Sequence, residues 1–162
     1  RYLDNPSLKN LLGLKYSFEA PWSKMIRRKV FTDNNILFDR TMVANDTMAS
    51  VKTAFYAKEI LATAEKIYCI TKTAHSLTAT VSREKYNQRL KVYFRKHKFL
   101  KENLTRREYG LVNFKVKSRL YSILYNRLGK WFYLWTFCRI ACHGVPFWRE
   151  LGPYKYIWSK KN

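Results

Sequence analysis

The stretch from Arg83 to Arg107 constrains the fold more than any other part of the chain. It consists largely of residues with high helix propensity, and Lys and Arg dominate its composition. Aromatic residues interrupt the charges at Tyr86, Tyr93 and Phe99. The pattern predicts one long, basic helix.

This basic stretch is also the strongest functional signal in the sequence. Only Glu84 and Glu102 oppose its many Lys and Arg residues, whereas an ordinary solvated helix face mixes both signs. Lys and Arg neutralise phosphates, and Tyr and Phe stack on unpaired bases. We interpret the stretch as a nucleic-acid contact, with a plain solvated face as the alternative.

The composition of the whole chain agrees with a polyanionic partner. The 162 residues include 32 Lys and Arg against 11 Asp and Glu, a formal net charge of +21. Self-repulsion at this charge is relieved by nucleic acid or by an anionic membrane surface. Hydrophobic residues make up 47% of the chain, too many for a disordered tail. The longest apolar runs, of about seven residues, are far shorter than the roughly 20 of a membrane-spanning helix, so no transmembrane segment is expected.

Hydrophobic periodicity predicts the remaining elements. Apolar residues between 36 and 48 line a short first helix, and residues 49–53 form a short strand. Residues 57–72 carry apolar side chains at spacings of three and four, which predicts an amphipathic helix. Another helix is predicted over 112–128, with Gly129 as its stop.

The C-terminal segment and the N-terminal segment complete the predicted fold. Aromatic and β-branched residues at 131–140 and 154–158, with Gly and Pro between them, predict two antiparallel strands. The expected fold class is α+β, a two-layer domain of helices packed on a small mixed or antiparallel sheet. Residues 1–35 are expected to form an irregular basic N-terminal arm. Residues 36–162 are expected to form the domain, with a long basic helical insertion around 76–110.

The predicted RNA-binding residues are the cations of the arm, the first elements, the long helix and the C-terminal third. They are Arg27, Arg28, Lys29, Arg40, Lys52, Arg83, Lys85, Arg89, Arg95, Lys96, Lys98, Arg106, Arg107, Lys115, Lys117, Arg139 and Arg149. Within the long helix, Arg95, Lys96 and Lys98 are all expected to be exposed.

Two clusters of other chemistry have structural interpretations. Cys138, Cys142 and His143, with the distant Cys69, suit zinc chemically, but their spacing is not that of a standard zinc knuckle. We therefore expect buried free thiols, no metal and no cofactor.

The aromatic residues of the two C-terminal strands are expected to lie mostly in the core, with stacking platforms as the alternative. The aromatic residues in question are Trp131, Trp135, Phe137, Phe147, Trp148, Tyr154 and Trp158.

Catalysis is not expected from this sequence. Its acids are scattered singly, and it has no Gly-rich phosphate loop and no nucleophile-elbow pattern. The three histidines lie in unlike surroundings. We expect neither an enzyme nor a small-molecule substrate.

Two parts of the chain resemble the bacterial-type large-subunit ribosomal protein seventeen family. Residues 51–67, which contain Ala-Lys-Glu-Ile and Ala-Glu-Lys-Ile, resemble the strand-to-helix passage of that family. Residues 120–129 resemble the family's helix ending in Leu-Phe-x-x-Leu-Gly. Residues 137–140, Phe-Cys-Arg-Ile, resemble its Tyr-Thr-Arg-Ile strand, and residues 151–158 resemble its closing strand.

The sequence departs from the family pattern at several places. The family's Gly-Gly before the Tyr-Thr-Arg-Ile strand is here Trp135-Thr136. Its basic His-Arg pattern near the first helix is here Phe38-Asp39-Arg40. Residues 76–109 are longer than the corresponding family region.

The resemblance implies a structural constituent of the large ribosomal subunit. Such a protein would bind large-subunit ribosomal RNA beside neighbouring ribosomal proteins, where the nascent chain emerges. Divergence, added length and the missing initiator Met favour a mitochondrial ribosome in the matrix. The alternatives are another RNA-binding protein, a nucleic-acid-processing enzyme, or a supernumerary basic subunit of a mitochondrial inner-membrane complex. The last would show helical aromatic belts without strand-like C-terminal segments.

Overall fold

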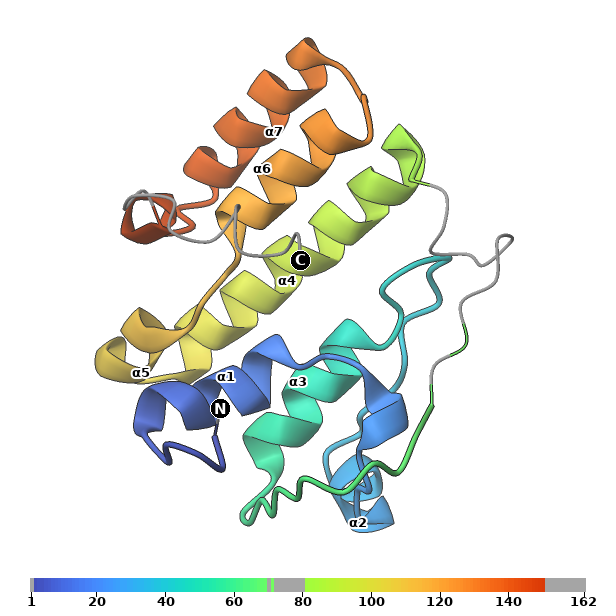
Figure 1. The fold of residues 1–162 in the computed structure, drawn as a ribbon, viewed down its shortest axis with the longest axis vertical. Helices are drawn as coiled ribbons and strands as arrows, with labels where there is room; N and C mark the ends of the chain where they lie inside the picture. Colours follow the sequence, from blue (N-terminus) through green and yellow to red (C-terminus); the bar gives the residue numbers. More distant parts are fainter. Residues whose placement is uncertain (1, 70, 72–80, 151–162) are drawn as a thin grey trace, which may run out of the picture. The chain divides into compact units, whose positions relative to one another are not determined.

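Every regular element that the computed structural model describes is a helix (Figure 1). The structure describes residues 2–69, 71 and 81–150, with only the backbone of the last two. The expected α+β fold with a small mixed or antiparallel sheet is therefore wrong. The chain divides into two compact units, residues 1–113 and 114–162.

Unit 1 is built around helices α1, α3 and α4. Its described elements are α1 (Leu8–Ser17), η1 (Pro21–Ser23), α2 (Arg28–Asp33), α3 (Thr47–Tyr56), α4 (Arg83–Asn103) and α5 (Arg106–Leu111). Helix α3 packs against α1, α2 and α4, and α5 packs against α1 and α4. The expected irregular arm is thus largely helical.

Helix α1 forms because the chain supplies a cap and an apolar pair. The hydroxyl of Ser7 accepts a hydrogen bond from the backbone N–H of Asn10 at 3.3 Å, as an N-cap residue does. Leu12 and Tyr16, four residues apart and so on one helix face, are both buried. The prolines on either side of this segment made it look irregular in the sequence.

Helix α3 occupies the segment where the sequence predicted the end of a helix and then a strand. Residues 36–46 form a loop instead of the first helix, and Ala44 takes a left-handed conformation with φ of 57° that interrupts any helix there. Ile36 and Val43 are nevertheless buried, as a helix would also have required. The strand expected at 49–53 is helical, because Met48 and Val51 face the core together at a spacing of three.

Helix α4 confirms the predicted long basic helix. The hydroxyl of Ser82 accepts from the N–H of Lys85 at 3.2 Å and caps its start. Buried residues recur along one face, including Tyr86, Leu90, His97 and Leu100. The opposite face carries the charges.

The amphipathic helix expected over residues 57–72 is absent from the described residues of that range, 57–69 and 71. The apolar side chains that would have formed its inner stripe have no core to enter, and Leu61 is 97% exposed. A helix of this length is marginal without tertiary packing. Within unit 1, the segment contacts η1 through the ring of Tyr68, which stacks on Trp22 at 5.3 Å between centroids.

Unit 2 contains α6 (Val116–Tyr125), α7 (Lys130–Cys142) and η2 (Phe147–Glu150). Helices α6 and α7 lie side by side, and α6 also contacts η2 (Figure 1). The helix predicted over 112–128 is confirmed for its central part. The strand predicted at 131–140 is wrong, because Thr136 and Ile140 are buried four residues apart, with helical periodicity. The strand predicted at 154–158 lies outside the described residues.

Both long helices of unit 2 end in a Schellman motif. At the end of α6, the N–H of Leu128 donates to the carbonyl of Ile123 and the N–H of Arg127 to that of Leu124, both at 3.0 Å. Helix α7 ends in the same way, with Gly144 at the left-handed position. In α6 that position belongs to Arg127, with φ of 52°, where glycine is the usual residue.

Candidate nucleic-acid interface

Most of the predicted RNA-binding cations are in contact with solvent. Exposed residues are Arg27, Arg28, Lys29, Arg40, Arg83, Arg95, Lys98, Arg106, Arg107 and Lys115. Half-buried residues are Lys52, Lys85, Arg89, Lys117 and Arg139. Lys96 is buried, and the side chain of Arg149 lies outside the described part of the structure.

Three of the exposed cations of α4 form a stripe that we call the α4 stripe: Lys91, Arg95 and Lys98. Their spacings of four and three place them on one face of the helix. Lys91 was missing from the sequence prediction, although the spacing alone could have identified it. A stripe of this kind follows a phosphate backbone without requiring a particular base sequence.

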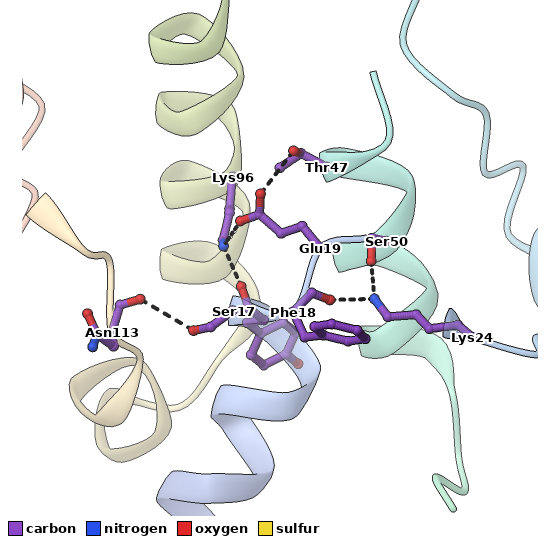
Figure 2. Close-up of polar contacts among 9 residues, drawn as sticks. Ser17, Phe18, Glu19, Lys24, Thr47, Ser50, Lys96 and Asn113 are labelled. Atoms are coloured by element: carbon purple, nitrogen blue, oxygen red, sulfur yellow. Dashed lines mark hydrogen bonds and ion pairs between the residues drawn. The ribbon is translucent and has the colours of Figure 1, made fainter. Parts of the chain in front are cut away.

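Lys96 has a structural role in unit 1 that the sequence did not indicate (Figure 2). Its residue is 4% exposed, and its ammonium group donates to the carbonyl of Tyr16 and to Glu19 Oε1, the latter at 2.5 Å. The other carboxylate oxygen of Glu19 accepts from the hydroxyl of Thr47 at 3.0 Å. The prediction that Arg95, Lys96 and Lys98 are all exposed is therefore wrong for Lys96, whose charge is used to join α4 to the end of α1 and to α3.

A second lysine ties the same region together. The ammonium group of Lys24 donates to the carbonyl of Phe18 at 2.5 Å and to the hydroxyl of Ser50 (Figure 2). Burial lowers the pKa of Lys24, and the nearby carboxylates of Glu19 and Asp46 oppose this shift. Half-buried Lys24 is thus held by α3 and by the segment that follows α1, whereas buried Lys96 is held by α1 and by Glu19.

Several carboxylates of unit 1 are engaged within the protein. Asp39 accepts two hydrogen bonds from the guanidinium of Arg95, each at 3.0 Å, in the bidentate geometry that suits this pair. Glu19 pairs with buried Lys96, and Glu102 lies 3.9 Å from Lys98 one helical turn away. Within the α4 stripe, the guanidinium group of Arg95 is therefore already paired with a carboxylate of the protein.

Glu108 has a local structural function at the start of α5. Its carboxylate accepts from the N–H and the hydroxyl of Thr105, while the Thr105 hydroxyl accepts from the N–H of Glu108, which completes a capping box. The hydrogen bonds from Thr105 lower the pKa of Glu108. On α1, burial raises the pKa of Tyr16 to about 12, and the charge of Glu108 adds to this shift.

The aromatic residues of α4 do not supply a stacking surface. Tyr86, Tyr93 and Phe94 are buried, and Phe99 packs edge-on against Phe55 at 5.4 Å between centroids. The aromatic part of the sequence interpretation of residues 83–107 is thus wrong. What α4 presents to a ligand is charge.

Three of the aromatic residues of unit 2 that were expected in the core are exposed, whereas Phe137 and Phe147 are half-buried and pack edge to face at 5.3 Å between centroids. Trp131, Trp135 and Trp148 are exposed, whereas the strand interpretation expected most aromatic residues of this region in the core. On a helix, Trp131 and Trp135 share the outer face that Thr136 and Ile140 leave. The guanidinium of Arg139 lies over the Trp135 ring at 4.6 Å from its centroid, a cation–π contact. Tyr154 and Trp158 lie outside the described residues.

The cysteines are exposed instead of buried as expected. Cys138 and Cys142 lie one turn apart on the outer face of α7, and Cys69 is exposed in unit 1. Across the part of the chain that the structure describes, no three His, Cys, Asp or Glu side chains gather into a potential metal site. Within the same residues, no helix combines the length and apolarity needed to cross a membrane.

Comparisons with known proteins identify no relative of this chain. No protein-family model, curated protein or solved structure matches the chain.

Proposed function

We propose that this protein is a structural RNA-binding subunit of a ribonucleoprotein particle, without catalytic turnover. The observation that carries the proposal is the excess of exposed cations over exposed acids among the described residues of unit 1. Lys96 is buried, and Glu19 and Asp39 pair with cations, while Lys91, Lys98 and the Arg106–Arg107 pair remain at the surface. A surface of this kind, on a chain of net charge +21, suits the phosphates of folded RNA.

Within this class, the large subunit of a mitochondrial ribosome is the particle that we favour. Large-subunit ribosomal RNA and the neighbouring ribosomal proteins would be its partners in the matrix. The similarity to large-subunit ribosomal protein seventeen gives limited support, because residues 137–140 lie in helix α7 and residues 57–67 are not helical. The charge and its placement carry the greater weight.

The exposed aromatic face of α7 favours a second candidate. A basic subunit of a mitochondrial inner-membrane complex was expected to show helical aromatic belts without strand-like C-terminal segments, and the described part of unit 2 has that character. Anionic lipid and partner proteins would then cover the basic and aromatic surfaces. We rank it second because the exposed cations of unit 1 extend over several elements, as binding to several RNA segments would require.

A fractionation experiment separates the two candidates. Mitochondrial extract is centrifuged through a sucrose gradient with and without prior RNase treatment. A ribosomal subunit protein travels with the large subunit and leaves that fraction after digestion. Sedimentation with a membrane complex, unchanged by RNase, would instead establish the second candidate.

A binding experiment tests the charge argument directly. Affinity of the purified full chain for RNA should fall with salt, with a slope in log–log form of roughly 0.7 to 0.9 for each neutralised phosphate. The double variant Lys91→Gln, Lys98→Gln should lower both affinity and slope. The matched control, Lys58→Gln with Lys66→Gln, removes the same charge from a segment where Glu59 and Glu65 are interleaved. Equal losses in the two variants would mean that only total charge matters, which contradicts the proposed surface.

A further inference from the structure

The link between α6 and α7 combines exposed rings with exposed cations. Tyr125 is 74% exposed and Trp131 is 85% exposed, the highest values among the aromatic residues named in unit 2. Arg127 and Lys130, which lie between them in the chain, are exposed as well. We call Tyr121, Tyr125, Arg127, Lys130 and Trp131 the hairpin tip.

The hairpin tip is held in place by the fold. Leu128 lies at its centre and is buried, and the Schellman hydrogen bonds fix residues 126–128 against the last turn of α6. The rings of Tyr121 and Tyr125 lie one helical turn apart with centroids separated by 6.2 Å. The tip is therefore a preorganised set of side chains joined to two packed helices.

Charge limits what the tip can bind. No Asp or Glu occurs between Phe114 and Trp148, a range that contains six cations: Lys115, Lys117, Arg119, Arg127, Lys130 and Arg139. An anionic ligand is attracted to such a hairpin, and a basic or neutral one is not. The exposed rings add that the ligand also has flat or apolar groups to place against them.

The backbone at Arg127 has a left-handed conformation, as it has at Asn35, Ala44 and Lys115. Arg127 adopts the left-handed conformation that Gly144 adopts at the end of α7, although a side chain makes this conformation costly. A glycine would complete the same motif without that cost.

We propose that the hairpin tip binds unpaired nucleotides of RNA, with Tyr125 and Trp131 stacking on bases and Arg127 and Lys130 contacting phosphates. This inference rests on the proposed RNA-binding function and adds a preference for single strands to it. The order of ring, two cations and ring suits a strand in which bases and phosphates alternate. A membrane surface fits less well, because Arg127 and Lys130 separate the exposed rings of Tyr125 and Trp131 in the chain.

The test compares ring variants on two RNAs of equal phosphate number, an unstructured single strand and a duplex. Tyr125→Leu and Trp131→Leu should each weaken single-strand binding by about fivefold or more, because stacking on one base contributes on the order of 1–3 kcal/mol, and duplex binding should be nearly unchanged. The matched control is Trp148→Leu, an exposed ring of the same unit outside the tip. Equal losses for Trp148→Leu and Trp131→Leu would overturn the assignment to the tip.

A third variant separates function from stability. Arg127→Gly should weaken RNA binding while the melting temperature of the full chain stays the same or rises, because glycine accepts the left-handed backbone. A lower melting temperature with unchanged RNA affinity would assign Arg127 a structural role and overturn its part in binding.

Two controls separate failure of this inference from failure of the proposed function. If the parent protein binds neither RNA in a salt-dependent way, the proposed function itself is wrong. If it binds both RNAs and the ring variants match the parent, only the assignment of the tip is wrong. Vesicles of phosphatidylcholine with cardiolipin provide the last comparison: ring variants that lose vesicle binding and keep RNA binding would assign the tip to membrane.

Discussion

Replacing Lys96 with Met should destabilise the protein far more than replacing Lys98, two residues further along the same helix. Removing one partner of a buried ion pair costs about 3–5 kcal/mol, because the remaining charge is left without compensation in the interior. The Glu19 side chain is 27% exposed, so water recovers part of this loss. We expect Lys96→Met to lower the free energy of unfolding by about 2–4 kcal/mol.

Lys98 is the matched control for this prediction. Its side chain is 77% exposed and its ion pair with Glu102 is long, at 3.9 Å. Such a pair contributes at most about 0.5 kcal/mol, so Lys98→Met should unfold nearly as the parent does. Both variants lose one positive charge and gain the same side chain, and therefore differ only in what the lysine contacts.

Urea unfolding followed by circular dichroism measures the difference. The double variant Lys96→Met, Glu19→Gln should recover part of the loss, since a neutral amide removes the stranded charge and still accepts from Thr47. If Lys96→Met unfolds within about 0.5 kcal/mol of Lys98→Met, the buried pair in Figure 2 does not stabilise unit 1 and the reasoning fails.

Three further predictions concern the helix cap and the core. Thr105→Ala removes the hydroxyl that accepts from the N–H of Glu108 but keeps the backbone N–H that donates to the Glu108 carboxylate, and it should cost about 0.5–2 kcal/mol in urea unfolding; no loss would contradict the assigned cap. Because the folded-state pKa of Glu108 is lowered, its stabilisation should be present above its unfolded pKa and disappear as pH falls through the folded value. The difference in unfolding free energy between the parent and Glu108→Gln, measured across acid pH, should shrink accordingly, and a constant difference would refute this linkage. Ile140→Ala should cost about 2–5 kcal/mol because the residue is fully buried, whereas half-exposed Leu134→Ala, on the same helix, should cost clearly less; similar melting curves would contradict the packing of α7.

The sequence predicted those helices whose charges or apolar spacing leave no alternative. Helix α4 was found almost to the residue at its start, because Ser82 caps it and its propensities agree with its pattern. Helix α6 was found at its centre for the same reason. For residues 131–140, a run of aromatic and β-branched residues fits the period of a strand as well as that of a helix. The sequence prediction of a strand is therefore wrong, and only the burial of Thr136 and Ile140, four residues apart, distinguishes the helix from the strand.

Residues 57–69 show the opposite error, because their local helix propensity predicts a helix that the structure does not contain. The sequence has helix-forming residues and a regular apolar stripe, yet Ile60, Leu61 and Ile67 of that stripe are exposed in the structure. Helix formation in proteins depends mostly on such packing. A single sequence does not reveal whether a partner surface exists.

For the candidate interface, too, the sequence predicted some features and not others. Charge identified α4 and the Arg106–Arg107 pair as surfaces, but it could not separate Lys96 from Lys98, since one faces Glu19 across the fold and the other faces solvent. Sequence distance is the cause: Lys96 and its partner Glu19 are 77 positions apart in the chain. Only a tertiary contact makes that lysine structural.

The C-terminal ends of α6 and α7 differ in how well their residue types predict the backbone conformation. At Gly144 the residue type announces the left-handed turn, so local sequence and fold agree. At Arg127 they disagree, because the fold requires a conformation that the side chain opposes. Natural sequences are largely consistent from local to global level, and departures concentrate at functional or strained sites. The sequence predicted the helix stop at Gly129, two residues beyond the left-handed Arg127, and this difference directs attention to the hairpin tip, where exposed rings and cations occur together.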